Sequence, residues 1–441
     1  MKRRTKTPDD GNAVEQVAGN GLLHRRALLG RSVAVAGVLG AGIGPGATGA
    51  AAEPLVEPPW GLTIGDNSPA YQTPSKFAKN VVRTLANPNF QPGSSIARTP
   101  HHLLDGTTTP NGLHFTIVHT GIPDIDPGRH RLLIHGLVKR PLVFTLDALL
   151  RYPTTSRISF MECGGNSAPL FSPKPIQDNV QALHGLASCA EWTGVKLSVL
   201  LEECGIDPRA KWFIAEGADA PHLMRSVPLA KGLDDAMVVF YQNGEPLMPG
   251  NGFPMRLLLP GWEGNLNIKY LRRIKLVTEP AMSFWESQVY TEPMPNGKAY
   301  QFTFFNEVKS FITRPSPGHE LKQPGVYEIS GIAYSGRGKI AKVMVSADGG
   351  RSWAEAALQA PVMSKAFTRF RMPWRWNGGA ALLQSRAWDD QGYFQPTRAE
   401  FVAARGELDA VPAVTAFRNH HFNAVTSWAI DPHGTVKHAY A

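Results

Sequence analysis

Apolar and polar positions alternate in short runs along most of the chain, with turn-forming residues between the runs. Between residues 103 and 280 the alternation predicts strands at 131–137, 156–162, 211–215, 225–229, 237–242 and 255–260. Only short runs have the spacing of apolar residues that is typical of a helix. Thr145 is placed to cap one short helix, and a second is predicted over residues 197–204, ending at Gly205. A helix over residues 75–85 is also expected, in an arm rich in Pro, Asn and Ser. This mixture predicts an α+β fold.

The pattern changes after residue 280, where helical spacing becomes rare. Short alternating strands separated by Gly and Pro are predicted at residues 325–333, 339–346, 352–358, 367–374 and 380–389. Residues 348–350, Asp-Gly-Gly, predict a tight turn among them. We therefore expect a mixed α/β domain over residues 53–280, followed by an immunoglobulin-like β-sandwich with a C-terminal tail over residues 281–441.

Residues 1–52 have the features of an export signal. The pair Arg25-Arg26 precedes a weakly apolar run over residues 32–49, and three alanines at 50–52 fit a cleavage site ahead of Glu53. Paired arginines before such a run are typical of the twin-arginine route, so we expect a periplasmic protein with no membrane span after signal removal. A membrane anchor and a disordered tail are the alternatives. An anchor is disfavoured because Gly and Pro interrupt the run, which is short for a bilayer.

Composition and charge narrow the class of protein. A chain of 441 residues with 43% hydrophobic residues, 43 Gly and 36 Pro is typical of a loop-rich globular protein of two or three domains. The formal net charge is +9. The Lys and Arg residues are scattered, without a recognition helix or a basic and aromatic array, so nucleic-acid binding is not expected. The charge would instead steer an acidic partner or an anionic substrate.

The chain has three cysteines, Cys163, Cys189 and Cys204, which form neither a disulfide framework nor a Cys-x-x-Cys pair. No Cys-x-x-Cys-His occurs, so no c-type haem is expected in this chain. Cys189 and Cys204 are interpreted as core residues. Cys163 ends a predicted strand and is followed by Gly-Gly-Asn, a turn that would present its sulfur as a metal ligand or nucleophile. Taken alone, burial in the core remains the alternative.

Several ordered motifs resemble the sulfite oxidase family of molybdenum enzymes, over roughly residues 100–400. Residues 163–166, Cys-Gly-Gly-Asn, are similar to the family's Cys-Ala-Gly-Asn turn, and residues 251–256 to its His-Gly-Phe-Pro-x-Arg motif. Residues 115–119 and 267–269 match segments that contact the pterin. Within the family the chain resembles the molybdenum-binding subunits of sulfane dehydrogenases. The resemblance implies a molybdenum-molybdopterin cofactor, a catalytic first domain and a dimerising β-sandwich.

The resemblance also implies roles for individual residues. Cys163 would ligate molybdenum through its thiolate, a soft anionic ligand, and Tyr290 would hydrogen-bond the reacting oxygen. The residues implied to bind the pterin or its phosphate are His119, Asp219, Asn251, Arg256, Asn267 and Lys269. Among these, Arg256 is expected to grip the phosphate with two hydrogen bonds and Lys269 to act as a point charge. Without the resemblance, a turn-forming Asp219, an interface Tyr290 and a surface Arg256 remain the alternatives.

Two departures from the family concern the substrate. Sulfite oxidases place arginines where this chain has Ile117 and Ala168. Each lost charge-assisted hydrogen bond weakens binding of a free dianion by about 1.5 to 3 kcal/mol. The pocket is therefore expected to accept a less charged or tethered sulfur group, such as sulfane on a carrier protein. Arg371 is a candidate to reach the site from the second domain.

The reading that follows is a periplasmic molybdenum oxidoreductase that oxidises carrier-bound sulfane sulfur. Its electrons would pass to a c-type cytochrome subunit, within a heterotetramer built on a homodimer. The aromatic and His-rich residues 417–428 either dock that cytochrome or pack on their own domain. The alternatives are a direct sulfite dehydrogenase or a reductase on the same fold, and a cofactor-free periplasmic binding protein.

Overall fold

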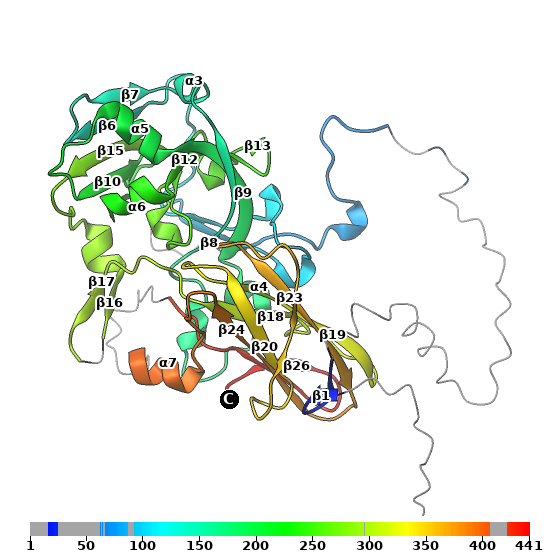
Figure 1. Ribbon diagram of the computed structural model, residues 1–441. Coiled ribbons are helices and arrows are strands. Elements are labelled where there is room, and N and C mark those ends of the chain that lie inside the picture. The colour runs from blue at the N-terminus through cyan, green and yellow to red at the C-terminus, as the bar shows by residue number, and fades with distance from the viewer. Residues whose placement is uncertain are drawn as a thin grey trace, which may run out of the picture.

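The computed structural model describes residues 16–24, 62, 64, 67–86, 92–294, 296–405 and 421–441. The paired arginines, the apolar run and the cleavage site of the predicted export signal lie outside these ranges. Figure 1 shows two parts: sheets with short helices in one, and a β-sandwich in the other. The long strands β8 and β9 extend from the first part toward the sandwich. The sheets and short helices of the first part and the sandwich of the second together make the predicted α+β fold.

The first part contains three sheets. The first has the order β11-β10-β15-β6-β7, with bounds Met224–Pro228, Trp212–Gly217, Leu271–Val277, Leu132–Gly136 and Leu142–Phe144; only β15 and β6 run parallel. The second has the order β13-β12-β9-β8, with bounds Glu245–Pro246, Met237–Gln242, Ala187–Lys196 and Thr155–Glu162, and β14, Arg256–Leu258, pairs with β12. The third has the order β3-β4-β5, with bounds Thr84–Ala86, Ser95–Arg98 and Thr116–Val118.

Short helices pack on these sheets. They are α3, α4, α5 and α6, with bounds Leu146–Leu149, Val180–His184, Leu197–Cys204 and Leu229–Asp234. The Thr145 hydroxyl accepts a hydrogen bond from the Ala148 amide at 3.0 Å, as expected of an N-cap. Helix α5 buries Leu197, Leu200, Leu201 and Cys204 and ends at Gly205, whose φ is +70°. Its buried face joins the core between the first two sheets.

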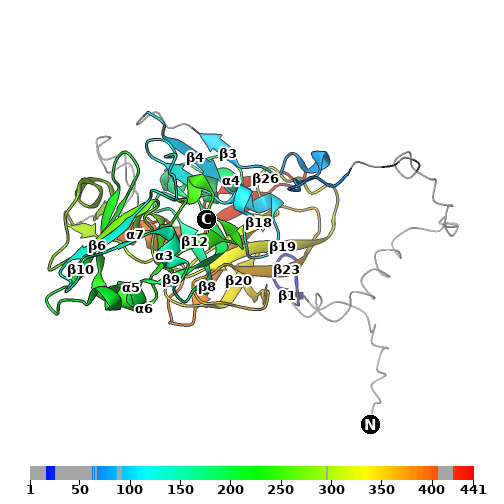
Figure 2. The same ribbon diagram turned by 90° about the horizontal axis from the view of Figure 1, so that it is seen from above.

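The second part is a sandwich of two antiparallel sheets. One has the order β1-β2-β23-β19-β18, with β22 beside β23; the bounds are Gln16–Ala18, Leu22–Leu23, Thr368–Trp376, Gly325–Tyr334, Lys309–Arg314 and Ala357–Leu358. The other has the order β21-β20-β24-β25-β26, with bounds Ala354–Glu355, Ile340–Ser346, Ala381–Asp389, Ser427–Ile430 and Val436–Ala439. Figure 2 shows β1 beside β23 at one end of the sandwich. The predicted β-sandwich is confirmed.

The remaining elements connect or flank the two parts. A hairpin of β16 and β17 spans Thr291–Pro293 and Ala299–Gln301, and α7 spans Arg398–Arg405. A single π-helical turn covers Trp285–Val289, just before Tyr290. Short 3-10 helices occupy Lys76–Ala78, His101–Leu103, Asn111–Leu113, Ala168–Phe171, Pro249–Asn251 and Gly264–Leu266.

The helix expected over residues 75–85 is wrong. Only Lys76–Ala78 is helical, as one 3-10 turn capped by the Ser75 side chain, and the chain then enters β3. Phe77 is 87% exposed and Leu85 76% exposed, so no apolar face holds a longer helix against the molecule. Hydrogen bonding of β3 to β4 decides the conformation instead.

The described part of the C-terminal tail packs on its own domain. Phe422 and Trp428 are buried in the core of the sandwich, and the Trp428 indole donates to the Ile312 carbonyl at 2.9 Å. Of the two readings of this tail, the structure therefore supports internal packing for residues 421–428. Arg371 likewise does not reach the site: its guanidinium pairs with Asp105 and Glu328 at 2.7 and 2.6 Å.

A buried ion pair joins the two parts next to Cys163. The Lys309 ammonium, at the start of β18, lies 2.7 Å from the carboxylate of Glu162, the last residue of β8, and both side chains are almost fully buried. Burial alone would raise the pKa of Glu162, but the Lys309 and His421 charges and the hydrogen bonds from Lys309 and Asn166 together lower it. Asn166 donates to the same carboxylate at 2.9 Å, and the His421 ring lies 3.6 Å from its other oxygen. This cluster ties the Cys163 turn to the sandwich and to the tail.

Replacing Lys309 should therefore be costly. In K309M the Glu162 carboxylate stays buried without its cation, and we expect the free energy of unfolding to fall by about 3 to 5 kcal/mol. Urea denaturation followed by tryptophan fluorescence measures the change. R371M, which breaks a partly exposed pair, is the control and should cost less than about 1 kcal/mol. Equal losses in the two variants would contradict a special role for the buried pair.

Candidate active site

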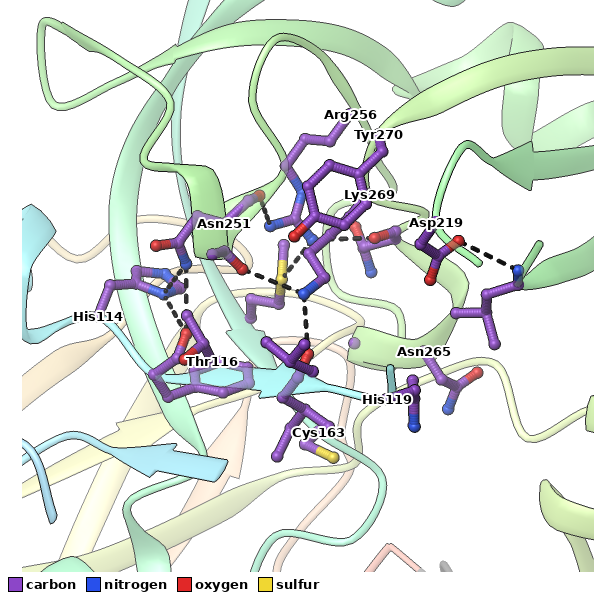
Figure 3. A pocket seen from close by; sticks show the side chains of 18 of the residues that line it. His114, Thr116, His119, Cys163, Asp219, Asn251, Arg256, Asn265, Lys269 and Tyr270 are labelled. Atoms are coloured by element: carbon purple, nitrogen blue, oxygen red, sulfur yellow. Dashed lines mark hydrogen bonds between the residues drawn. The ribbon is translucent and has the colours of Figure 1, made fainter. Parts of the chain in front are cut away.

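One pocket collects all eight residues that the sequence predicted for the site. It lies between β5, the turn after β8 and the loops around β14 and β15, with an empty volume of about 730 Å³ that includes open solvent. Its lining includes Cys163, Tyr290, His119, Asp219, Asn251, Arg256, Asn267 and Lys269. Figure 3 shows Lys269 near the centre, between Arg256 and Cys163. The structure brings these residues together, while their individual roles stay predictions.

The Cys163 turn is held by backbone and side-chain hydrogen bonds. The Cys163 amide donates to the Leu186 carbonyl at 2.9 Å, and the Asn166 amide closes the turn on the Cys163 carbonyl at 2.9 Å. The Asn166 side-chain oxygen accepts from the Leu186 amide at 3.0 Å. A Cβ at Gly164 would lie 3.1 Å from a Glu263 carboxyl oxygen, so a side chain there would be crowded. The turn therefore needs its small residue and its Asn.

The environment of the Cys163 sulfur favours the neutral thiol in the absence of a cation. Burial raises the pKa of Cys163 to about 11, and the neighbouring Glu263 and Glu162 carboxyls act in the same direction. A bound metal cation reverses this preference, because a coordinated thiol is deprotonated. The sulfur is thus inert until a metal binds.

Lys269 is a cation without a matching anion. Its ammonium donates to the Ile117 and Gly250 carbonyls at 2.8 and 3.1 Å, and among the described residues it has no carboxylate at ion-pair distance. Burial lowers the pKa of Lys269 to about 7, helped by the nearby Arg256 charge, while Asp219 opposes the shift. A pocket that holds two cations so close together is suited to a phosphate or another dianion.

Arg256 lines the pocket and also donates to two backbone carbonyls. One terminal nitrogen donates to the Asn251 carbonyl at 2.7 Å, and the other to the Asn267 carbonyl at 2.9 Å. Its guanidinium also lies 5.2 Å from the centre of the Trp192 ring. The two hydrogen bonds to carbonyls use two of the five guanidinium N–H donors, and Nε has no hydrogen-bond partner among the described residues. Arg256 therefore fixes the loops of Asn251 and Asn267 and adds positive charge to the pocket, and its two-bond grip on a phosphate stays a prediction.

The other predicted pterin contacts lie on the pocket wall. His119 packs on Trp285 with ring centres 4.9 Å apart, and burial lowers its pKa to about 4, so the imidazole is neutral. Asp219 accepts from the Leu223 amide at 3.3 Å, and burial raises its pKa. Asn267 donates to the Trp262 and Glu263 carbonyls at 3.2 and 2.9 Å and accepts from Leu259. Asn267 is therefore a structural link as well as a lining residue.

Tyr290 lies beside a cation that the sequence analysis missed. The Arg225 guanidinium is fully buried, 4.8 Å from the centre of the Tyr290 ring, and donates to Asn265. Burial raises the pKa of Tyr290, so its hydroxyl stays protonated and can donate a hydrogen bond. Arg225 is in a strand, β11, with no motif around it, so only its burial reveals it.

Two further side chains at the site were not predicted. His114 lines the pocket with a buried ring nitrogen that has no hydrogen-bond partner among the described residues, and burial lowers its pKa to about 3. Glu263 accepts from Asn265 at 2.8 Å beside the Cys163 turn, and burial raises the pKa of its carboxyl. Their sequence signal was proximity to the motifs, His114 to His119 and Glu263 to Asn267.

The residues present fit a molybdenum-molybdopterin group. The Cys163 thiol lies at a strand end on the pocket wall, and two buried cations of the same pocket, Arg256 and Lys269, would pair with an anion such as the pterin phosphate. Among the described residues no cluster of three or more His, Cys, Asp or Glu could hold a metal by itself. No helix in that part of the chain is long and apolar enough to cross a membrane.

Two family models match the chain in sequence order. Residues 119–285 match the oxidoreductase molybdopterin binding domain, and residues 302–411 match the Mo-co oxidoreductase dimerisation domain. Mouse mitochondrial sulfite oxidase is 29% identical over 70% of this chain and 59% of its own length. A soybean inducible NADH nitrate reductase is 29% identical over 72% of this chain and 40% of its own length. The chain thus spans less than two thirds of these relatives.

The two matched domains and the fold show that the chain belongs to the sulfite oxidase family of molybdopterin enzymes. A more specific likeness is to the crystal structure of the sulfane dehydrogenase SoxCD from Paracoccus pantotrophus. That structure superimposes with a TM-score of 0.82 at 39% sequence identity, over 87% of this chain and 97% of the matched one. The resemblance found in the sequence is confirmed, and the reading as a cofactor-free binding protein is set aside.

Lys269 makes anion binding in this pocket dependent on pH. Its pKa of about 7 in the anion-free protein must rise when a dianion binds, so binding takes up a proton above pH 7. We expect the affinity of the cofactor-free protein for sulfate, a dianion that does not titrate here, to fall between pH 7 and 9 by up to about tenfold per pH unit. Isothermal calorimetry measures it.

The control is K269R, which keeps its charge throughout this range. Its sulfate affinity should be nearly independent of pH between 7 and 9. The same slope in the variant and in the unchanged protein would contradict the assignment to Lys269.

Proposed function

We propose that the chain is the molybdenum subunit of a periplasmic sulfane dehydrogenase. It would oxidise sulfane sulfur attached to a carrier protein and pass electrons to a SoxD-like c-type cytochrome subunit. The observation that carries this proposal is the likeness to SoxCD, at 39% identity over nearly the whole of the matched chain. A heterotetramer built on a homodimer and export by the twin-arginine route complete the proposal, with residues 53–280 as the catalytic domain and 281–441 as the dimerisation domain.

The pocket wall supports a substrate that is not a free dianion. Ile117 lines the pocket where sulfite oxidases have an arginine, and the Lys269 ammonium is held at the carbonyl of that same residue. Ala168 is exposed at the start of a 3-10 helix and is not among the residues that line the pocket, so of the two departures only Ile117 bears on the pocket charge. The cation behind Tyr290, Arg225, contacts the tyrosine ring and Asn265. A sulfur group bound to a carrier protein needs less charge pairing in the pocket, because the carrier supplies part of the binding.

In this proposal, molybdenum-molybdopterin supplies a two-electron redox change beside the substrate sulfur when it is bound. Cys163 holds the metal through its thiolate, and Lys269 neutralises the pterin phosphate. His119, Asn251, Asn267 and Asp219 position the pterin through hydrogen bonds, with Arg256 keeping their loops in place. Tyr290 donates its hydroxyl proton in a hydrogen bond to the reacting oxygen, and the aromatic wall of Trp285 limits access of water.

The alternative is a direct sulfite dehydrogenase, or a reductase on the same fold. The family supports it, since both mitochondrial sulfite oxidase and NADH nitrate reductase are among the relatives. These enzymes share the cofactor-binding pattern but act on small anions in opposite directions. The substrate comparison below decides between the two functions.

Replacing the proposed metal ligand should abolish turnover without unfolding the protein. We expect C163S to keep its melting temperature within a few degrees and to lose about two or more orders of magnitude in kcat, because a neutral hydroxyl is a poor ligand for this metal. C204A, in the core of the first part, is the matched cysteine control and should keep its activity. Full turnover by C163S with molybdenum bound would contradict the ligand assignment.

The substrate is tested by electron transfer to cytochrome c. The purified, cofactor-loaded protein and its cytochrome partner receive free sulfite and carrier-bound sulfane in parallel. We expect a higher kcat/KM with the carrier-bound substrate. Micromolar free sulfite as the better substrate would leave the family and the cofactor in place but favour the sulfite dehydrogenase.

A variant that adds a positive charge to the pocket wall tests the same account of substrate choice. I117R restores a cation to the pocket wall, and we expect it to raise kcat/KM for free sulfite about tenfold, through KM. I117L keeps the wall apolar and serves as the control. An unchanged KM for sulfite in I117R would contradict our account of the pocket charge.

A further inference from the structure

The N-terminal hairpin, residues 16–24, lies on the β-sandwich although the sequence places it upstream of the predicted export signal's paired arginines. Strands β1 and β2 form it, and β2 pairs with β23 through Leu22 and Trp374. Both views show it in blue at one end of the sandwich, beside β23 (Figures 1 and 2). Leu22 is fully buried and belongs to the core of the sandwich, and Leu23 is 5% exposed. These residues are therefore part of the folded domain.

Polar groups of the sandwich meet the hairpin at its turn. The Gly19 amide donates to the Ser352 hydroxyl at 2.7 Å, and the Asn20 side chain donates to the Ala347 carbonyl at 2.8 Å. In the opposite direction, the Trp374 indole donates to the Asn20 carbonyl at 2.7 Å, and the Arg375 amide donates to the Gly21 carbonyl at 2.8 Å. In these four hydrogen bonds, polar groups of the hairpin turn and of the sandwich satisfy one another, as buried polar groups in a specific contact do.

The turn sequence Gly-Asn-Gly fits this site closely. Gly21 has a φ of +88°, and a Cβ there would lie 2.0 Å from the Arg375 carbonyl oxygen. A Cβ at Gly19 would lie 2.3 Å from a carboxylate oxygen of Asp348. Asn20 has a φ of +56°, which Asn tolerates better than most residues. The sandwich therefore selects this segment by shape as well as by hydrogen bonding.

We propose that the edge of β23 is a binding slot for the N-terminal hairpin, which anchors the export leader on the folded sandwich until the chain is cut. The residues that follow the hairpin include Arg25-Arg26 and the apolar run, and the predicted cut lies before Glu53. Before the cut, the hairpin is tethered and its effective concentration at the slot is high. The cut turns it into a separate peptide that can leave.

Departure of the hairpin changes the sandwich. Leu22 leaves the core, and the Trp374 indole and the Arg375 amide lose their acceptors. The edge of β23 then offers unpaired backbone groups beside an apolar slot, which is the type of surface that accepts another strand. Leader removal is thus coupled to the exposure of a strand-binding edge on the mature protein.

Hydrogen exchange on the full-length, cofactor-loaded chain tests whether the hairpin is seated. We expect slow exchange at residues 19–23 and at Arg375. In G21V, where a side chain would meet the Arg375 carbonyl, both regions should exchange at least about tenfold faster. Q16A is the control, because Gln16 is exposed and bonds only within the hairpin, so it should leave both rates unchanged. Exchange of the hairpin at the rate of an unstructured peptide, or unchanged Arg375 protection in G21V, would overturn the proposal.

A site-specific cut tests the same slot without altering the hairpin. A protease site in place of residues 50–52 of the full chain allows cleavage after folding and cofactor loading. Once the N-terminal fragment has been removed by dilution and gel filtration, Arg375 protection should fall about tenfold or more while core amides of β19 keep theirs. Arg375 protection that survives removal of the fragment would overturn the proposal.

Discussion

The buried pair of Glu162 and Lys309 is the interaction on which the site most depends. Glu162 is the last residue of β8, the strand that leads into the Cys163 turn. Lys309 is the first residue of β18, a strand of the sandwich. Since neither charge reaches water, each is stable only while the other is in place. Asn166 joins the same carboxylate and also closes the turn. The position of the cysteine sulfur is thus set jointly by the two parts of the molecule.

The pocket has the opposite electrostatic character. Lys269 and Arg256 are cations near each other that donate to backbone carbonyls, and within the described ranges neither has a carboxylate at ion-pair distance. Such an arrangement is costly in the anion-free protein, as the lowered pKa of Lys269 shows, and an anion of the cofactor relieves it. The pocket is therefore electrostatically suited to an anionic cofactor group.

Prediction from the sequence worked where a residue's function follows from a local motif. The glycines and asparagine after Cys163, the segment around Arg256 and the segment ending at Lys269 all lie at one pocket, as their order implied. It failed where three-dimensional packing decides. The motif around Arg256 did not reveal that its guanidinium also holds the carbonyls of Asn251 and Asn267. Arg225 was missed because a strand arginine becomes notable only when it is found buried against Tyr290.

By itself, the sequence determined the α+β class, the sandwich, the family and the set of residues that meet in the pocket, because alternation, turn residues and short motifs are local properties of the chain. Only the tertiary structure decided that residues 75–85 form no long helix, that Phe422 and Trp428 pack inward, and that residues 16–24 complete the sandwich. Each of these outcomes depends on whether a distant surface is available to bury an apolar side chain or pair a backbone group, and no local pattern encodes that.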